Sequence, residues 1–184
     1  MILHPWHALS FGKGSPETVN AVIEITKGSK AKYELDKDTG LLRLDRVLRT
    51  HLAYPFHYGF IPQTYCDDND PLDAVIICSE PLVPLSIVEI TPIGALHMID
   101  GGQQDDKIIA VVTHDHSVNG IKSLDEFPQD LLETIRDFFQ TYKKLEEKQV
   151  VVDRFLDHNE AHLLIEQSID SYKKALEDGI FGTL

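Results

Sequence analysis

The stretch Asp67–Ile77 has the sequence DDNDPLDAVII, in which four carboxylates in seven residues are followed directly by an apolar run that predicts a buried strand. Two carboxylates about 5 Å apart repel each other by roughly 3 kcal/mol at an effective dielectric constant near 20. Holding such a cluster at the end of a strand therefore destabilises the fold unless a cation neutralises it. All-oxygen ligands suit a hard ion such as Mg²⁺, Mn²⁺ or Ca²⁺ rather than zinc. The alternative is a solvated acidic turn, because Asp, Asn and Pro are ordinary turn formers.

A calcium-binding EF-hand loop is excluded by the spacing of this stretch. Asp68 and Asp70 match the first and third positions of such a loop. However, Asp73 stands where the loop needs glycine, and Ser79 stands where its closing Glu belongs.

The composition of the whole chain limits its partners. A chain of 184 residues, 42% hydrophobic and 26% charged, is predicted to form one domain over residues 1–184. Its net charge of −13 argues against a nucleic acid or an anionic membrane as partner, because there is no basic surplus to neutralise phosphates. The N-terminus shows no signal-peptide pattern and the apolar runs are too short to span a bilayer, so a cytoplasmic protein is expected.

Short apolar or alternating segments predict a strand-rich N-terminal part. The first three expected strands are joined by tight turns, which suggests an antiparallel meander. The aromatic segment 54–62 is too rich in Pro and Gly for a regular element. Pro92 and Gly94 separate two further strand candidates. Strands are expected at residues 19–26, 31–35, 41–48, 74–77, 87–90, 95–99 and 107–112.

The C-terminal part shows helical spacing of its apolar residues. The first expected helix covers residues 128–148 and has Pro128 in its first turn. The second covers residues 161–176 and stops at Gly179. Many short strands followed by two helices predict an α+β fold, mainly β, in which a small barrel or curled sheet has helices packed outside it.

Other residue types are less informative by themselves. Asp100 and Asp105 flank a glycine turn between two expected strands, and Glu24 interrupts an apolar strand; each pattern is also typical of turn or rim residues. The chain has no phosphate-binding loop of the GxxxxGK[ST] type, no GxSxG elbow and no HExxH pair. Its nine histidines are interpreted as mainly surface residues. Four cations stand alone beside apolar segments, a pattern that is typical of surface side chains whose charged ends reach water. They are Lys32, Arg46, Lys107 and Lys143.

The run Asp68–Asp73 matches the D-x-D-P-x-D motif of family I soluble inorganic pyrophosphatases. Other motifs of that family follow in the same order along the chain, and the chain resembles the family from about His4 through the second expected helix. The matching positions are Glu24, Lys32-Tyr33-Glu34, Asp45-Arg46, Tyr54-Pro55, Tyr58-Gly59, Asp100, Asp105, Lys107 and Tyr142-Lys143.

The resemblance implies a fold and an activity. The fold would be an OB-like five-stranded β-barrel with flanking helices, in a single inorganic pyrophosphatase domain. The activity would be Mg²⁺-dependent hydrolysis of pyrophosphate to two orthophosphates by a metal-activated water. Several Mg²⁺ ions would serve each site, with Mn²⁺ or another hard divalent ion as a substitute. The expected assembly is a homo-oligomer, with a hexamer favoured.

The resemblance also implies roles for individual residues. Asp70 would be the general base, because its neighbours Asp68 and Asp73 would carry the metal. The metal ligands would be Asp68, Asp73, Asp105, Asp100 and Glu24. The substrate-binding groups would be Lys32, Arg46, Tyr58, Lys107, Tyr142 and Lys143. Glu34 and Tyr54 would be further active-site residues.

This chemistry accounts for the mixture of charges. Pyrophosphate is a multiply charged anion that a bare carboxylate cavity repels, whereas bound Mg²⁺ inverts the local field and neutralises the leaving phosphate. Lys, Arg and Tyr side chains then orient the phosphoryl groups for in-line attack. Two other functions remain open at this point: hydrolysis of another phosphoanhydride or phosphoester, and an OB-like binding module without catalysis.

Three positions depart from the pattern of the family. His57 stands where the family commonly has Asn, beside Tyr58. Leu85 lies in a segment that replaces a common Pro-Gly turn, and Gln149 falls where some members carry another cation. None of the three belongs to the expected catalytic set.

Overall fold

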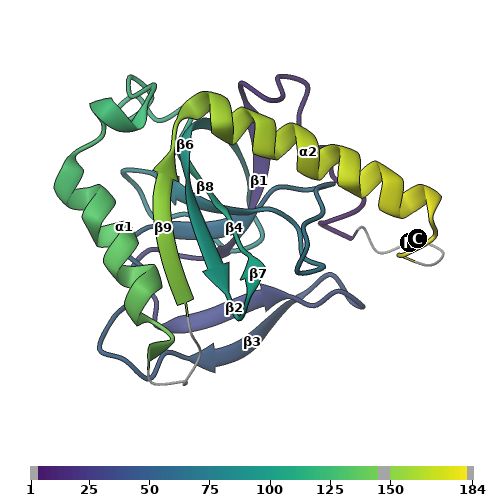
Figure 1. Ribbon diagram of the computed structural model, residues 1–184, viewed down its shortest axis with the longest axis horizontal. Coiled ribbons are helices and arrows are strands. Elements are labelled where there is room, and N and C mark those ends of the chain that lie inside the picture. Colours follow the sequence, from purple (N-terminus) through teal and green to yellow (C-terminus); the bar gives the residue numbers. More distant parts are fainter. Residues whose placement is uncertain (1–3, 145–149, 182–184) are drawn as a thin grey trace.

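Five strands form a closed ring in the computed structural model, which describes residues 4–144 and 150–181 (Figure 1). In order around the ring, the strands are β1 (Val19–Ile25), β4 (His57–Phe60), β5 (Asp73–Ile77), β8 (Lys107–Val112) and β6 (Ile87–Asp100), which pairs back with β1. The pairing of β5 with β8 is parallel and the other four pairings are antiparallel.

Two helices lie outside the ring, α1 (Gln129–Thr141) on one side and the long α2 (His158–Glu177) across another (Figure 1). Helix α1 contributes Ile135, Phe138 and Phe139 to the largest hydrophobic cluster, while α2 packs Ala161, Ile165 and Ile169 against a second cluster. The predicted α+β, mainly β fold with five main strands and flanking helices is confirmed.

The expected N-terminal meander is confirmed in the antiparallel pairing of its second and third strands and is wrong in the pairing of its first strand. Strands β2 (Ala31–Leu35) and β3 (Leu42–Val47) form a separate two-stranded sheet, whereas β1 pairs with β4 and β6. Burial explains the difference, because β1 is buried at six of its seven positions and requires neighbours on both faces. Strand β3 is exposed at four of its six positions, so it suits a hairpin at the edge of the ring.

Three further expectations about the strands are corrected. The segment expected to be irregular contains β4, and the two candidates separated by Pro92 and Gly94 are one strand, β6, with a bulge between these residues. A Cβ atom at Gly94 would lie 2.5 Å from the Leu124 side chain in the short 3₁₀ helix η1 (Leu124–Glu126) and 2.6 Å from the Leu156 backbone oxygen. Because the backbone oxygen cannot rotate away, glycine is required at this bend. Strands β7 (Gln103–Gln104) and β9 (Val150–Leu156) were not expected, and both pair with β6.

The helix ends also differ from the sequence pattern. Helix α1 ends at Thr141, before Tyr142 and Lys143, whereas the pattern predicted a helix to residue 148. The rest of that prediction, residues 145–149, lies outside the described residues, and so does the departure at Gln149. Helix α2 begins earlier than expected, because Asp157 and Glu160 form a capping box. Among the described residues, no helix is long and apolar enough to cross a membrane.

Leu85 occupies a turn position that favours glycine. The Ser86 N–H donates to the Val83 carbonyl (3.1 Å), which closes a four-residue turn with Pro84 at its second position. Leu85 has φ of +65° at the third position, the arrangement of a type II turn. An L-residue in this left-handed region is strained, so the departure from the family's Pro-Gly turn has an energetic cost.

We expect Leu85→Gly to be more stable than Leu85→Ala by about 1 kcal/mol, because both changes remove the side chain but only glycine relieves the positive φ. Urea denaturation of the two variants measures this difference in the free energy of unfolding. Equal stability of the two variants would show that the turn is not strained.

Candidate active site

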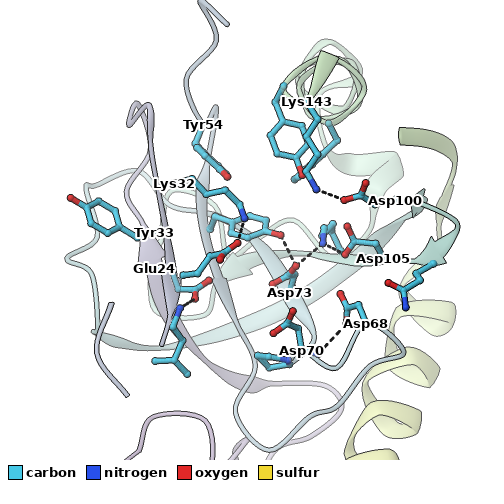
Figure 2. A pocket seen from close by; sticks show the side chains of 18 of the residues that line it. Glu24, Lys32, Tyr33, Tyr54, Asp68, Asp70, Asp73, Asp100, Asp105 and Lys143 are labelled. Atoms are coloured by element: carbon cyan, nitrogen blue, oxygen red, sulfur yellow. Dashed lines mark hydrogen bonds and ion pairs between the residues drawn. The ribbon is translucent and has the colours of Figure 1, made fainter. Parts of the chain in front are cut away.

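A cavity of about 380 Å³ lies where the ring, the β2–β3 hairpin and the end of α1 meet (Figure 2). It brings together residues from across the chain, including both ends of the acidic segment Asp68–Asp73. The predicted site residues that line it are Glu24, Lys32, Glu34, Tyr54, Tyr58, Asp68, Asp70, Asp73, Asp100, Asp105, Lys107, Tyr142 and Lys143. Arg46 is the predicted site residue that is not among the lining residues; it lies on β3 opposite Lys32 and forms an ion pair with Asp45.

Sheet register places the central acid and the central cation side by side. Asp73 begins β5, Lys107 begins β8, and the two residues are direct partners in the parallel ladder. The parallel pairing therefore brings the starts of both strands to the same end of the ring. The acidic loop before β5 and the Asp105 segment before β8 consequently meet at this end.

Lys107 is the buried cation of the site, with only 3% of its side chain exposed. Its Nζ donates to Asp73 Oδ2 (2.5 Å) and to Asp105 Oδ1, and it lies 5.9 Å from the centroid of the Tyr58 ring. Burial alone would lower the pKa of Lys107, but the attraction of Asp73 and Asp105 raises it well above its ordinary value. Lys107 is therefore an ammonium group.

The acidic loop is a tight turn held by its own backbone. The Asn69 N–H donates to the Cys66 carbonyl (3.0 Å), and the Cys66 N–H donates to the Asp70 carbonyl (2.9 Å). Asn69 has φ of +66°, a left-handed conformation that Asn tolerates better than most residues. The Asp70 N–H donates to Asp68 Oδ1 (3.1 Å). These bonds turn the Asp68, Asp70 and Asp73 side chains into the cavity (Figure 2).

Further ion pairs cross the rest of the cavity. Lys143, which follows α1, pairs with Asp100 at the end of β6 (Figure 2). On the hairpin, Lys32 pairs with Glu34, and its Nζ lies 3.5 Å from Asp45 Oδ2. Cations and carboxylates are thus interspersed on the cavity wall.

The site carries a surplus of negative charge that these pairs do not remove. Burial and the charge of Asp73 raise the pKa of Asp68 to about 6. The same two causes raise the pKa of Glu24 to about 8, although Glu24 Oε1 accepts a hydrogen bond from the Leu35 N–H (2.7 Å). The cavity therefore favours either protonated carboxyls or an added cation.

The chemistry of the donors fits a hard divalent cation. All predicted ligands are carboxylates, which match the oxygen preference of Mg²⁺ and Mn²⁺. Within residues 4–144 and 150–181, no group of three His, Cys, Asp or Glu side chains converges closely enough to hold a metal ion. Two of the predicted ligands, Asp73 and Asp105, are bonded to Lys107 instead.

Three tyrosines supply neutral hydrogen-bond donors. Burial is the main cause that raises the pKa of Tyr54, Tyr58 and Tyr142 above the ordinary value, so all three phenols keep their protons. The Tyr58 hydroxyl donates to Asp73 Oδ2 (2.6 Å). Helix α1 positions the other two, because Phe138 lies 4.7 Å from the Tyr54 ring and 5.2 Å from the Tyr142 ring between centroids.

Sequence reasoning missed several lining residues. Lys37 lies three residues after the recognised Lys32-Tyr33-Glu34 motif, in the same hairpin, so its position in the sequence could have indicated that it lines the site. Trp6 gave no such signal, because the fold brings it to the cavity from the N-terminal segment. Tyr33 and Pro71 belong to the recognised motifs but were given no role, and the lining residues that were missed altogether are Trp6, Leu35, Lys37, Gln103 and Phe139.

Comparison with known proteins identifies the family of this chain. The family model described as inorganic pyrophosphatase matches residues 21–173 of the chain. This chain belongs to the inorganic pyrophosphatase family.

Relatives in the inorganic pyrophosphatase family match nearly the whole chain. Soluble inorganic pyrophosphatase 2 of Chlamydomonas reinhardtii is 46% identical over 171 residues, which cover 93% of this chain and 89% of the relative. Soluble inorganic pyrophosphatase 1 of Arabidopsis thaliana is 48% identical over 169 residues, which cover 92% of this chain and 80% of the relative. The crystal structure of inorganic pyrophosphatase from Thermus thermophilus has a TM-score of 0.87 at 39% identity, covering 90% of this chain and 97% of that one.

His57, where pyrophosphatases of this family commonly have Asn, is buried and is thus an exception to the interpretation of the histidines as mainly surface residues. Only 1% of it is exposed. The Lys27 N–H donates to Nδ1 (3.0 Å), so the ring proton lies on Nε2, which donates to the Glu80 carbonyl (3.1 Å). Burial lowers the pKa of His57, and the ring is neutral in the fold.

We expect His57→Asn to reduce the loss of stability on acidification. Because the folded state lowers the pKa of His57, its contribution is complete above the unfolded pKa of about 6.5 and is lost as pH falls through the folded pKa. An Asn amide keeps one acceptor and one donor without titrating. Urea denaturation at pH 7 and at pH 5 should show a smaller decrease in free energy of unfolding for His57→Asn than for wild type. The other titrating groups are common to both proteins, so an equal decrease would contradict a neutral, buried His57.

Proposed function

We propose that this chain hydrolyses pyrophosphate to two orthophosphates with the help of several Mg²⁺ ions, for which Mn²⁺ or another hard divalent ion can substitute. The observation that carries the proposal is the cavity in which carboxylates, ammonium groups and phenols from six strands and the end of α1 face one another. Membership of the inorganic pyrophosphatase family supports the choice of substrate.

The carboxylates would divide into two kinds. Asp68, Asp73 and Asp105 would hold the tighter metal sites, and Glu24 and Asp100, with Asp105, would serve the ions that arrive with substrate. Bound Mg²⁺ supplies charge neutralisation and acidifies the attacking water. Asp70 would accept the proton of that water, because it is the acid of the loop that lines the cavity and is left out of the metal set.

The cations and phenols would hold the two phosphoryl groups. Lysine ammonium groups on β2, on β8 and after α1 come from three directions, which suits an extended, multiply charged anion. The protonated phenols add donors that bring no charge. The groups proposed for this role are Lys32, Arg46, Tyr58, Lys107, Tyr142 and Lys143, with Glu34 and Tyr54 as further active-site residues.

The assembly and surroundings of the protein stay predictions. They are a single domain over residues 1–184, a homo-oligomer with a hexamer favoured, and a cytoplasmic location without nucleic-acid or membrane partners.

Replacement of the proposed general base tests the mechanism. We expect the wild type with Mg²⁺ to release orthophosphate from pyrophosphate and Asp70→Asn to lower kcat by about 10²–10³, since the amide cannot accept the proton. The matched control is Asp67→Asn, a change in the same acidic loop at a residue that does not line the cavity, and it should leave kcat unchanged. Binding of pyrophosphate without release of orthophosphate would favour a binding module, and wild-type kcat in Asp70→Asn would contradict the role of Asp70.

Metal removal tests the carboxylate cluster. Because the surplus negative charge destabilises the fold, we expect Mg²⁺ to raise the melting temperature over that in EDTA. A ligand at 100 times its Kd stabilises the native state by about 2.7 kcal/mol. The variant Asp73→Asn should respond less to Mg²⁺, whereas Asp67→Asn should respond as wild type does. A wild-type melting curve that is identical in Mg²⁺ and EDTA would rule out a converged metal site.

A further inference from the structure

The turn between β2 and β3 holds Lys37 in a defined place. The Gly40 N–H donates to the Asp36 carbonyl (2.8 Å), and the Thr39 N–H and hydroxyl donate to Asp36 Oδ1 (2.9 and 2.7 Å). These bonds, with that of Arg43 to the same carboxylate, hold the pKa of Asp36 at about 2. The Lys37 carbonyl accepts a further bond from His4 Nε2 (3.0 Å). The backbone that carries Lys37 is therefore anchored.

The ammonium of Lys37 bridges the hairpin and the acidic loop. Its Nζ lies 2.5 Å from Asp70 Oδ1, donates to the Asn69 carbonyl (2.9 Å), and stands 5.9 Å from the centroid of the Trp6 ring. A lysine has three donors, so it can bond a carboxylate and a carbonyl together. The Trp6 face attracts the same cation from a third direction.

Lys37 differs from the other lysines of the cavity in its partner. Lys107 pairs with Asp73 and Asp105, and Lys143 pairs with Asp100, so these two lysines bond carboxylates of the proposed metal set. Within the part of the chain that the structure describes, Lys37 instead forms its ion pair with Asp70, the proposed general base.

We propose that Lys37 is a positioning residue that holds Asp70 at the distance and angle its reaction requires; this inference rests on the proposed role of Asp70 as general base. The carboxylates of the same loop repel Asp70, and Lys37 opposes that displacement. The pair uses Oδ1 of Asp70 and leaves Oδ2 to accept the proton. A base must lie within about 2.6–3.2 Å of the atom it deprotonates, and a misplacement of 1 Å can lower a rate by about 10²-fold.

The same contact couples two halves of the site. The β2–β3 hairpin carries Lys32, a proposed phosphate ligand, and also presents Lys37 to the acidic loop. Through Lys37 the base and the substrate-binding hairpin keep a fixed relative position. Stability does not require the pair, because Lys37 and Asp70 are each nearly half exposed and such pairs contribute only about 0–1 kcal/mol.

The test compares Lys37→Met and Lys37→Arg in the full chain, with Mg²⁺ and pyrophosphate. We expect Lys37→Met to lower kcat about 10- to 100-fold with KM within about twofold of wild type, and Lys37→Arg to recover part of kcat. In an Asp70→Asn background, Lys37→Met should cause no further loss, because the base it positions is already absent. The matched control is Lys27→Met, since Lys27 also lies over an aromatic ring (5.7 Å from the Phe56 centroid) but does not line the cavity.

Several outcomes would overturn the inference. A higher KM with unchanged kcat would make Lys37 a substrate-binding residue, and an equal loss of kcat in the Asp70→Asn background would make its role independent of Asp70. A melting temperature of Lys37→Met lowered by more than about 4 °C, without recovery of kcat in Lys37→Arg, would make the role structural. If Asp70→Asn loses activity while Lys37→Met keeps it, only this inference fails. If Asp70→Asn keeps wild-type kcat, the proposed base and this inference fail together.

Discussion

The buried ammonium of Lys107, held between the carboxylates of Asp73 and Asp105, is the interaction on which the site depends. It requires β5 and β8 to lie side by side and parallel, because only then do Asp73 and Lys107 start their strands at the same end of the ring. Removing one partner of such a buried pair typically costs about 3–5 kcal/mol, since the other charge is left uncompensated. The strand pairing and the charge network therefore stabilise each other, and the cavity forms where they meet.

This network balances the charge of the cavity only in part. The raised pKa values of Asp68 and Glu24 indicate that the fold holds more carboxylate than its own cations neutralise. A site built for stability alone would replace such groups with apolar residues. The excess is consistent with the proposed Mg²⁺ binding, because bound cations would let the cavity attract a highly charged phosphate substrate.

Local patterns predicted the elements better than their pairing. Alternation and apolar runs located β1, β2, β3, β5 and β8, since these depend on neighbouring residues along the chain. The meander was wrong for β1, because it assumed that β1 pairs with the next strand along the chain, whereas β1 pairs with β4 and β6 within the ring and β2 pairs only with β3 among the described strands. Strand β9 was not predicted, although its run Val150-Val151-Val152 favours a strand. Its burial scarcely alternates, and its pairing with β6 defines it.

The sequence by itself determined the chemistry of the site: the acidic loop from Asp68 to Asp73, its rigid Pro71, and the lysines and tyrosines that the family motifs share. These depend on residue type and short spacing, which a linear chain displays directly. Only the tertiary structure decided which of these groups meet. It seated Lys107 between two acids and left Arg46 off the cavity wall. It also brought Trp6 and Lys37 to the acidic loop, because contacts between distant segments are set by strand pairing and burial rather than by local sequence.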